Sequence, residues 1–487
     1  MADDDGVVFP EAGGTRSTSA FGRSVVADAL RAVDPVGSAA AARDTNWRRG
    51  YLTHFRRLVE AGLPTADAAV TVATDGLTAA RDRMRYLTAK GEEVPLAEAF
   101  DAARAGDVET VTVTGDAERE TELALPYRGE RLTGDALRRR LDAWVEGGIV
   151  EPSVAEAVRD VQVNPEWLDL SGYRVVVLGA GAEMGPLRSL LRWGADVAAV
   201  DLPRPDVWER VLRSVREGAG TLRVPVRAEA PRTGDLAKRA GLDLLTDLPT
   251  VADWLLGIDG RLVLGNYVYA DGATNVRLAL AVDALTTRVA GERPDTALAF
   301  LGTPTDVYAV PGEAVAFSTE AYGRRNAVKA LRRPLKAVSA GRLLRRNYAP
   351  GSDPGINDSL VPQQGPNYAL AKRVHRWRAT VARHEGTDVS FHVAPATRTR
   401  SVVKNRVLAS AYAGAKPFGI EVFEPETSNT LMAALLVHDL RNPRPPREHP
   451  WRDEAYAAAH GGLWRSAYDP RSALGLAVLL GLAGARG

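Results

Sequence analysis

The chain has 487 residues, of which 45% are apolar and 25% charged, with no cysteine and a net charge of +1. This length favours two domains, or one large domain with extensions, in an ordinary globular protein. The lack of cysteine excludes disulfides, thiolate catalysis and thiolate-ligated zinc, and the balanced charge gives no support to nucleic-acid binding. The acidic N-terminal stretch lacks the features of a signal peptide, so we expect a cytoplasmic protein without a membrane partner.

The first 165 residues predict a mainly helical accessory domain. Residues 1–20 are rich in Gly, Ser and Thr, and we expect a disordered tail there. Over much of residues 21–165, apolar residues recur at helical spacing. One exception is the β-branched, partly alternating run at residues 108–114, which predicts a strand. This part shows no catalytic pattern, so we interpret it as an accessory or oligomerising domain and expect a homo-oligomer.

From Tyr173 onward, short apolar runs alternate with helical stretches. The runs cover residues 175–178, 197–200, 262–264 and 297–301. Continuous apolar strands of this kind are typical of a parallel sheet that helices cover on both faces. We therefore predict an α/β fold with a Rossmann-like, doubly wound parallel sheet over residues 166–445. A C-terminal helical extension follows over residues 446–487.

A glycine-rich turn follows the first of these strands. It supplies the candidate cofactor contacts Gly179, Gly181, Glu183, Met184 and Gly185. Glycines allow a backbone to approach a pyrophosphate, and Asp201, at the end of the next strand, is placed to bind ribose hydroxyls and to favour NAD over NADP. Met184 takes the place of the third glycine in G-x-G-x-x-G, and Glu183 must point away from a phosphate. The alternative is a tight turn that binds nothing.

Tyr368 and Lys372 stand four residues apart in a helix that is expected to begin after Gly365-Pro366. This spacing puts the phenol and the ammonium on one helix face, where the positive charge can lower the phenol pKa. Lysine is rare in this chain, with seven residues, so the pair is less easily accidental. The alternative is an ordinary surface pair. We interpret the neighbouring arginines as a solvated helix face: Arg373, Arg376, Arg378 and Arg383.

Together these features resemble the short-chain dehydrogenase/reductase family. The glycine turn is similar to the family's Gly-x-x-x-Gly-x-Gly pattern, with Glu183 in place of the middle glycine. Residues 245–254 resemble the end of its third strand and the helix that follows. Asn266 is similar to the asparagine of its Asn-Ala-Gly motif, and the strand at residues 297–303 resembles the one that delivers the catalytic serine, with Thr303 in its place.

The resemblance implies a role for each candidate residue. Tyr368 would transfer a proton to or from the substrate oxygen, and Lys372 would lower its pKa and hold the nicotinamide ribose. Thr303, or alternatively Ser359, would hydrogen-bond the substrate oxygen, and Asn275 would support a proton-relay water. The implied cofactor contacts downstream of the glycine turn are Asn266, Pro395 and Thr397. The long segment before Tyr368 is interpreted as an insertion over about residues 312–360.

The function expected from this resemblance is hydride transfer between a nicotinamide cofactor and a small carbonyl or alcohol substrate. NAD is the expected cofactor, and NADP is possible. Two alternatives stay open: an S-adenosylmethionine-dependent methyltransferase and a non-catalytic nucleotide-binding protein. No metal site is expected, because the histidines lack metal-ligand spacing.

Overall fold

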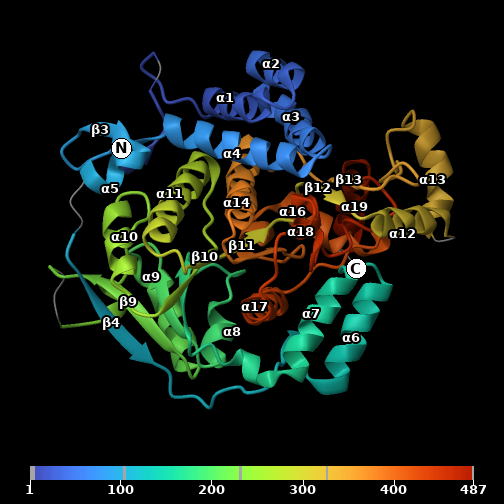
Figure 1. Ribbon diagram of the computed structural model, residues 1–487. Helices are drawn as coiled ribbons and strands as arrows, with labels where there is room; N and C mark the ends of the chain where they lie inside the picture. Colours follow the sequence, from blue (N-terminus) through green and yellow to red (C-terminus); the bar gives the residue numbers. More distant parts are fainter. Residues whose placement is uncertain (1–5, 12, 103–105, 230–232, 325–326, 485–487) are drawn as a thin grey trace.

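The computed structural model describes residues 6–11, 13–102, 106–229, 233–324 and 327–484. Its largest sheet has seven strands in the order β14-β11-β10-β7-β8-β9-β4 (Figure 1). The strands are β4 (Val108–Thr114), β7 (Tyr173–Leu178), β8 (Asp196–Val200), β9 (Thr221–Arg227), β10 (Arg261–Asn266), β11 (Ala297–Gly302) and β14 (Val389–Val393). Neighbouring strands are parallel except β4, which is antiparallel to β9. The chain therefore has a mixed α/β fold with a mostly parallel sheet.

Helices cover both faces of this sheet. One face carries α10 (Leu248–Leu256), α11 (Gly272–Glu292) and α14 (Pro366–His384), and the other carries α8 (Leu187–Arg192), α9 (Pro205–Arg216) and α17 (Pro425–Arg441). Successive side chains of a strand point to opposite faces. Accordingly, Val176 and Leu178 of β7 belong to the first core, while Val175 and Val177 belong to the second. This arrangement confirms the prediction of a parallel sheet covered on both sides.

The third parallel strand in chain order lies at a different place in the sequence from the one that the resemblance predicts. We expected it to end near Leu245, but residues 243–247 form no strand, and β9 takes this position at Thr221–Arg227. The four predicted apolar strands are each confirmed, as β7, β8, β10 and β11. The predicted strand at residues 108–114 is confirmed as β4, but it forms the edge of the main sheet. The predicted boundary at residue 165 therefore cuts across one sheet.

The N-terminal region is tightly packed on the rest of the chain. It contains α1 (Thr18–Arg31), α2 (Pro35–Arg43), α3 (Trp47–Gly62), α4 (Ala66–Arg83), α5 (Ala99–Ala102) and a small sheet of β1 (Gly6–Val8), β2 (Arg85–Leu87) and β3 (Glu93–Pro95). Gly76 of α4 faces Trp377 of α14 so closely that a Cβ atom would lie 2.5 Å from the indole ring. The expected disordered tail is wrong for residues 6–11 and 13–20, because β1 is buried and paired and α1 begins at Thr18; residues 1–5 and 12 lie outside the described residues.

The remaining elements surround this body. Between β4 and β7 lie β5 (Leu125–Tyr127), β6 (Glu130–Leu132), α6 (Gly134–Glu146) and α7 (Pro152–Val163). Between β11 and α14 lie β12 (Val307–Val310), α12 (Gly312–Gly323), α13 (Ala327–Val338) and β13 (Gly355–Asp358), with β12 paired to β13. After β14 come α15 (Arg400–Lys404), α16 (Arg406–Ala413), α18 (Pro450–Ala455) and α19 (Pro470–Gly484). Figure 1 shows α12 and α13 projecting from one side.

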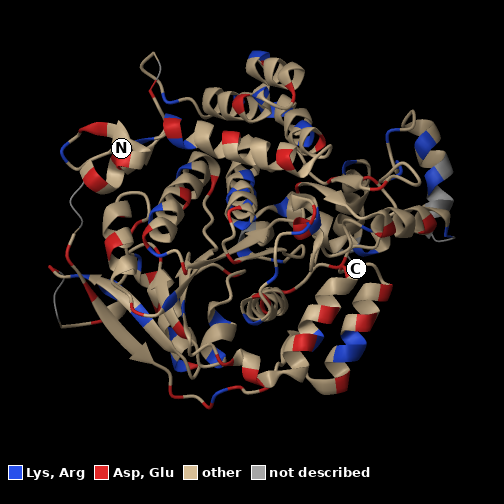
Figure 2. Cartoon of the chain, in the orientation of Figure 1, with Lys and Arg blue, Asp and Glu red and all other residues tan. Residues whose placement is uncertain are grey.

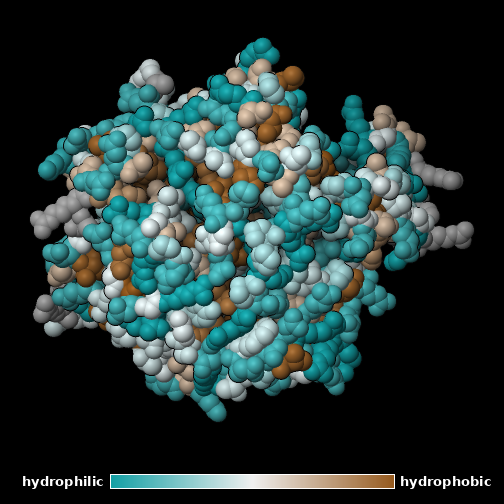
Figure 3. Space-filling model, in the orientation of Figure 1, coloured by the Kyte–Doolittle hydropathy of each residue, from teal (hydrophilic) through white to brown (hydrophobic). Residues whose placement is uncertain are grey.

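The surface in Figure 3 is mostly hydrophilic or neutral, with small brown areas scattered over this face. Within the described ranges, none of the helices combines the length and the apolar character needed to cross a membrane.

Candidate functional site

Tyr368 lies in the first turn of α14, where this helix begins beside the carboxyl end of β11. Pro366 opens the helix, and Gly365 precedes it with a φ of 81°, a conformation that favours glycine. Thr303 directly follows β11, and its side chain lies beside the Tyr368 phenol and lowers the pKa of that phenol. The Thr303 hydroxyl also lies 2.9 Å from the hydroxyl of Thr305. The structure thus brings together two candidate residues that are 65 positions apart in the sequence.

The Tyr368 phenol is held in its neutral form. Burial raises the pKa of Tyr368, and the contact with Thr303 offsets this rise only in part. Lys372 is not among the groups that shift this pKa in the structure, so the lowering that we expect from Lys372 stays a prediction. The ring of Tyr269 meets that of Tyr368 edge-on, with centroids 6.3 Å apart, and the Tyr269 hydroxyl donates to Asp271 Oδ1 at 2.8 Å. Sequence reasoning missed Tyr269, because no spacing rule connects it to α14.

Lys372 stands one turn beyond Tyr368, and no counter-ion accompanies it in the described part of the chain. Its side chain is half-buried and makes no ion pair with the carboxylates of the described residues. Burial lowers the pKa of Lys372 to about 8. His375, three residues further, is 4% exposed, and its Nε2 atom is buried without a hydrogen-bond partner among the described residues. Burial and then the Lys372 charge lower the pKa of His375, so it is neutral. The helical spacing of three residues could have pointed to His375.

Asn275 lies in the first turn of α11, the helix that packs beside α14. Its Oδ1 accepts from the Ala270 N–H at 3.1 Å, and its Nδ2 is buried without a partner in the described part of the chain. Asn266 ends β10, and its Oδ1 accepts from the Val268 N–H at 3.4 Å. Polar groups from β10, α11, β11 and α14 therefore gather at the carboxyl edge of the sheet.

Ser359 is not part of this group. It is 1% exposed, and its hydroxyl donates to Asn357 Oδ1 at 2.6 Å. Of the two candidates for the serine role, only Thr303 contacts Tyr368 among the described interactions.

The glycine turn lies at the carboxyl end of β7 and is closed partly by its own chain. Gly179 has a φ of 83°, and a Cβ atom there would lie 3.1 Å from the backbone of Tyr267. The Gly181 N–H donates to Asp201 Oδ2 at 2.7 Å, and the Leu202 N–H donates to Asp201 Oδ1 at 2.8 Å. The half-buried Asp201 carboxylate, whose pKa burial raises, thus holds the turn in shape. The sequence predicted Asp201 as a ribose contact but did not predict that it stabilises the glycine turn.

Glu183 points towards α15 rather than across the turn. Its carboxylate accepts from the Arg400 backbone N–H at 2.8 Å and pairs with Arg400 Nε at 3.2 Å. Met184 is half-buried against the second core, and the Gly185 carbonyl accepts a hydrogen bond from Asn429 of α17. Asn429 is a further contact of the turn that sequence reasoning missed, since it lies far downstream.

The loop after β14 is anchored on the same helix. Thr397 is 5% exposed; its hydroxyl donates to the Pro395 carbonyl at 2.9 Å and lies 2.6 Å from the Ser428 hydroxyl. Pro395 and Thr397 thus have structural contacts of their own, and the structure shows neither of them touching Tyr368.

The arginines of α14 were predicted to form a solvated face, and this is wrong for three of them. Arg373, Arg376 and Arg378 are between 3% and 8% exposed. Figure 2 shows the blue segments of α14 at the centre of the molecule. Asp306 accepts from both Arg373 Nη2, at 2.9 Å, and Arg376 Nη1, at 2.6 Å. Arg376 also pairs with Glu454, and Arg378 pairs with Asp283.

Comparison with known proteins adds no identification: no protein-family model matches the chain, and no curated protein matches it. Across the residues that the structure describes, no group of three or more His, Asp and Glu side chains is arranged to hold a metal ion.

Proposed function

We propose that this protein is an NAD(P)-dependent oxidoreductase of the short-chain dehydrogenase/reductase type that reduces a small carbonyl substrate. One observation carries the proposal. Thr303, directly after β11, lies beside the Tyr368 phenol, and the Lys372 ammonium, which has no counter-ion among the described residues, lies one helical turn further along α14. A phenol, a hydroxyl and an ammonium at the carboxyl end of a parallel strand are suited to proton transfer.

The strand order supports a Rossmann-like interpretation of the sheet. With β7 as the first strand, the six parallel strands follow the order 3-2-1-4-5-6 of doubly wound dinucleotide-binding folds. In such sheets, ligands bind beyond the carboxyl ends of the strands, where the order reverses. Here that position lies between β7, which leads into the glycine turn, and β10, which ends at Asn266.

The residues at this edge fit a nicotinamide dinucleotide. The buried Nδ2 of Asn275 and the Lys372 ammonium are donors without partners among the described residues, and ribose hydroxyls and phosphates offer acceptors. Lys372 would hold the nicotinamide ribose, and the turn at Gly179–Gly185 would face the pyrophosphate. Asp201, at the end of β8, would disfavour a 2′-phosphate, so NADH should bind more tightly than NADPH.

The chemistry of the chain's own residues favours reduction. The raised pKa of Tyr368 keeps its phenol protonated near neutral pH, so it can donate this proton to the substrate oxygen. Thr303 would hydrogen-bond the same oxygen and orient it. The Lys372 charge would stabilise the phenolate that remains, and Asn275 would hold a water for its reprotonation. A bound nicotinamide would supply the hydride.

The test begins with titration of the purified protein with NADH, NADPH and S-adenosylmethionine, followed by turnover on a panel of small carbonyl compounds. Tyr368→Phe should reduce kcat by about a hundredfold or more while NADH binding is retained. Tyr173→Phe, which removes a phenol at the start of β7, is the matched control and should turn over normally. Unchanged turnover in Tyr368→Phe would remove this residue from the chemistry. Binding of S-adenosylmethionine alone, or of NADH without any turnover, would contradict the proposal in favour of the two alternatives.

A further inference from the structure

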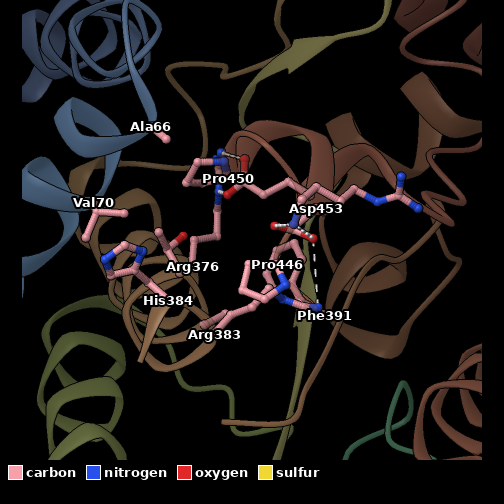
Figure 4. A pocket seen from close by; sticks show the side chains of 13 residues that line it. Ala66, Val70, Arg376, Arg383, His384, Phe391, Pro446, Pro450 and Asp453 are labelled. Atoms are coloured by element: carbon pink, nitrogen blue, oxygen red, sulfur yellow. Dashed lines mark hydrogen bonds and ion pairs between the residues drawn. The ribbon is translucent and has the colours of Figure 1, made fainter. Parts of the chain in front are cut away.

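A groove runs along the opposite end of α14 from Tyr368. Helical rise places Tyr368 and Arg383 about 22 Å apart along the axis. The groove lies between the last turns of α14, the edge strand β14 and residues 444–456. Its two parts share Arg383, Phe391 and Asp453, so they form one continuous depression. Figure 4 shows one part, with Ala66 and Val70 of α4 facing Pro446 and Asp453 across it.

Three arginines converge on one part of this groove: Arg383, Arg444 and Arg447. Arg444 Nη2 donates to Asp439 Oδ1 at 2.7 Å, but Arg444 Nε and Nη1 are buried without a partner in the described part of the chain. The guanidinium of Arg447 lies 4.5 Å above the Tyr456 ring and makes no ion pair with a described carboxylate. Arg444 lies over the same ring, at 3.4 Å. Guanidinium N–H groups of Arg444 therefore remain without an acceptor among the described residues.

The carboxylates that line the groove do not satisfy these donors. Asp439 is shared among His392 Nε2, at 2.7 Å, Arg444 Nη2, at 2.7 Å, and His438 Nδ1, at 3.4 Å. Asp453 accepts from the Arg447 backbone N–H at 3.2 Å, and its nearest contact with Arg383 Nη1 is 3.8 Å. Three guanidinium groups thus face two carboxylates, and the remaining positive charge is available to an anion.

The other part of the groove is largely apolar. Its walls include Ala66 and Val70 from α4, Phe391 from β14, and Pro446 and Pro450. Arg376 and Glu454 also reach it, but they neutralise each other through two hydrogen bonds of 2.7 and 2.8 Å. A ligand that extends from the arginines into this part would place apolar atoms there.

We propose that this groove binds a phosphate monoester whose short apolar group lies against Val70 and Phe391. Guanidinium groups match the oxygens of phosphate in a fork geometry, and the guanidinium groups of Arg444 and Arg447 would meet such a dianion. The site is separate from the Tyr368 region and does not depend on the proposed reductase activity.

The experiment is calorimetric titration of the full chain with inorganic phosphate and with hexyl phosphate. Both should bind saturably, and hexyl phosphate should bind about tenfold or more tightly, because its chain buries apolar surface. Arg447→Gln should weaken both ligands about tenfold or more. Val70→Ser should weaken hexyl phosphate alone. Arg447 is preferred to Arg444 as the test position, because removing Arg444 would also unpair Asp439.

Two variants serve as controls. Arg452 is an exposed arginine that stacks on Trp451 in the same segment, and Arg452→Gln should bind both ligands as the unmodified protein does. Tyr368→Phe should also bind phosphate normally, which separates this site from the proposed catalytic one. Absence of saturable binding of either ligand at millimolar concentration would overturn the proposal. Equal affinities in Arg447→Gln and the unmodified protein would do so as well.

Discussion

The middle and the beginning of helix α14 bury polar groups in opposite ways. In the middle of α14, Arg373, Arg376 and Arg378 each meet a carboxylate within hydrogen-bonding distance. In its first two turns, Lys372 has no counter-ion among the described residues, and Tyr368 meets the side chain of Thr303 and the ring of Tyr269 but no charged partner among those residues. A buried polar group without a partner lowers stability by about 1–3 kcal/mol. The difference indicates that the middle of α14 holds the fold together, while its beginning is arranged for a ligand.

The largest change in the free energy of unfolding should come from the middle of α14, where the buried arginines are paired with carboxylates. Asp306 is 1% exposed and binds both Arg373 and Arg376. Asp306→Asn keeps the shape but leaves Arg373 without its carboxylate partner and Arg376 with Glu454 alone, so the free energy of unfolding should fall by about 3–5 kcal/mol. Urea unfolding at neutral pH measures this change.

An exposed ion pair provides the control for Asp306. Asp388 pairs with Arg261 at 2.6 Å on the surface, and Asp388→Asn makes the same chemical change. Asp388→Asn should lower the free energy of unfolding by less than about 1 kcal/mol. Similar losses in the two variants would show that burial does not decide the contribution of these pairs.

The folded protein also shows why the sequence located some strands and not others. β7, β8, β10 and β11 are buried on both faces, so each is a continuous apolar run that the sequence displays directly. β9 lies near the sheet edge and carries Arg223 and Arg227, which pair with Asp196 and Asp247. These charges interrupt the apolar run, and the third strand was therefore assigned to a later segment.

The site residues that could be predicted are those marked by a local pattern, such as the end of an apolar strand or the spacing of a helix. Thr303 was found because it ends an apolar strand, and Tyr368 because helical spacing joins it to Lys372. The buried arginines were misjudged because their partners are distant: Asp306 lies 67 residues before Arg373, and Glu454 lies 78 after Arg376. Spacing on one helix cannot reveal such partners. The same limit hid the role of Asp201 in closing the glycine turn.

A smaller, pH-dependent effect is expected at Lys372. Its pKa of about 8 in the folded chain lies below the ordinary 10.5, so the folded state binds this proton less tightly than the unfolded state. The charge therefore lowers stability fully below about pH 8, and this loss fades as the pH rises towards 10.5. Lys372→Met should raise the free energy of unfolding at pH 7 by up to about 3 kcal/mol. The gain should shrink at about pH 10.

Lys90 is exposed, and Lys90→Met is the control for the loss of one positive charge. It should change the free energy of unfolding by about 0.5 kcal/mol or less at either pH. A Lys372→Met protein that is less stable at pH 7 would mean that the ammonium has a stabilising partner. If the proposed chemistry holds, kcat of the unmodified enzyme should also fall as the pH rises through about 8, where Lys372 loses its charge.

The smallest effect should distinguish the hydroxyl of Thr303 from its shape. Thr303→Val removes the contact that lowers the Tyr368 pKa, whereas Thr303→Ser keeps a hydroxyl. The valine variant should lose about tenfold in kcat, and the serine variant should stay within about threefold of the unmodified enzyme. Ultraviolet titration of the tyrosines should show the Tyr368 pKa rising further in the valine variant only. Equal kcat values in the two variants would mean that Thr303 packs against Tyr368 without acting on the substrate oxygen. The beginning of α14 would then hold Tyr368 and Lys372 without a hydroxyl that acts together with them on a substrate.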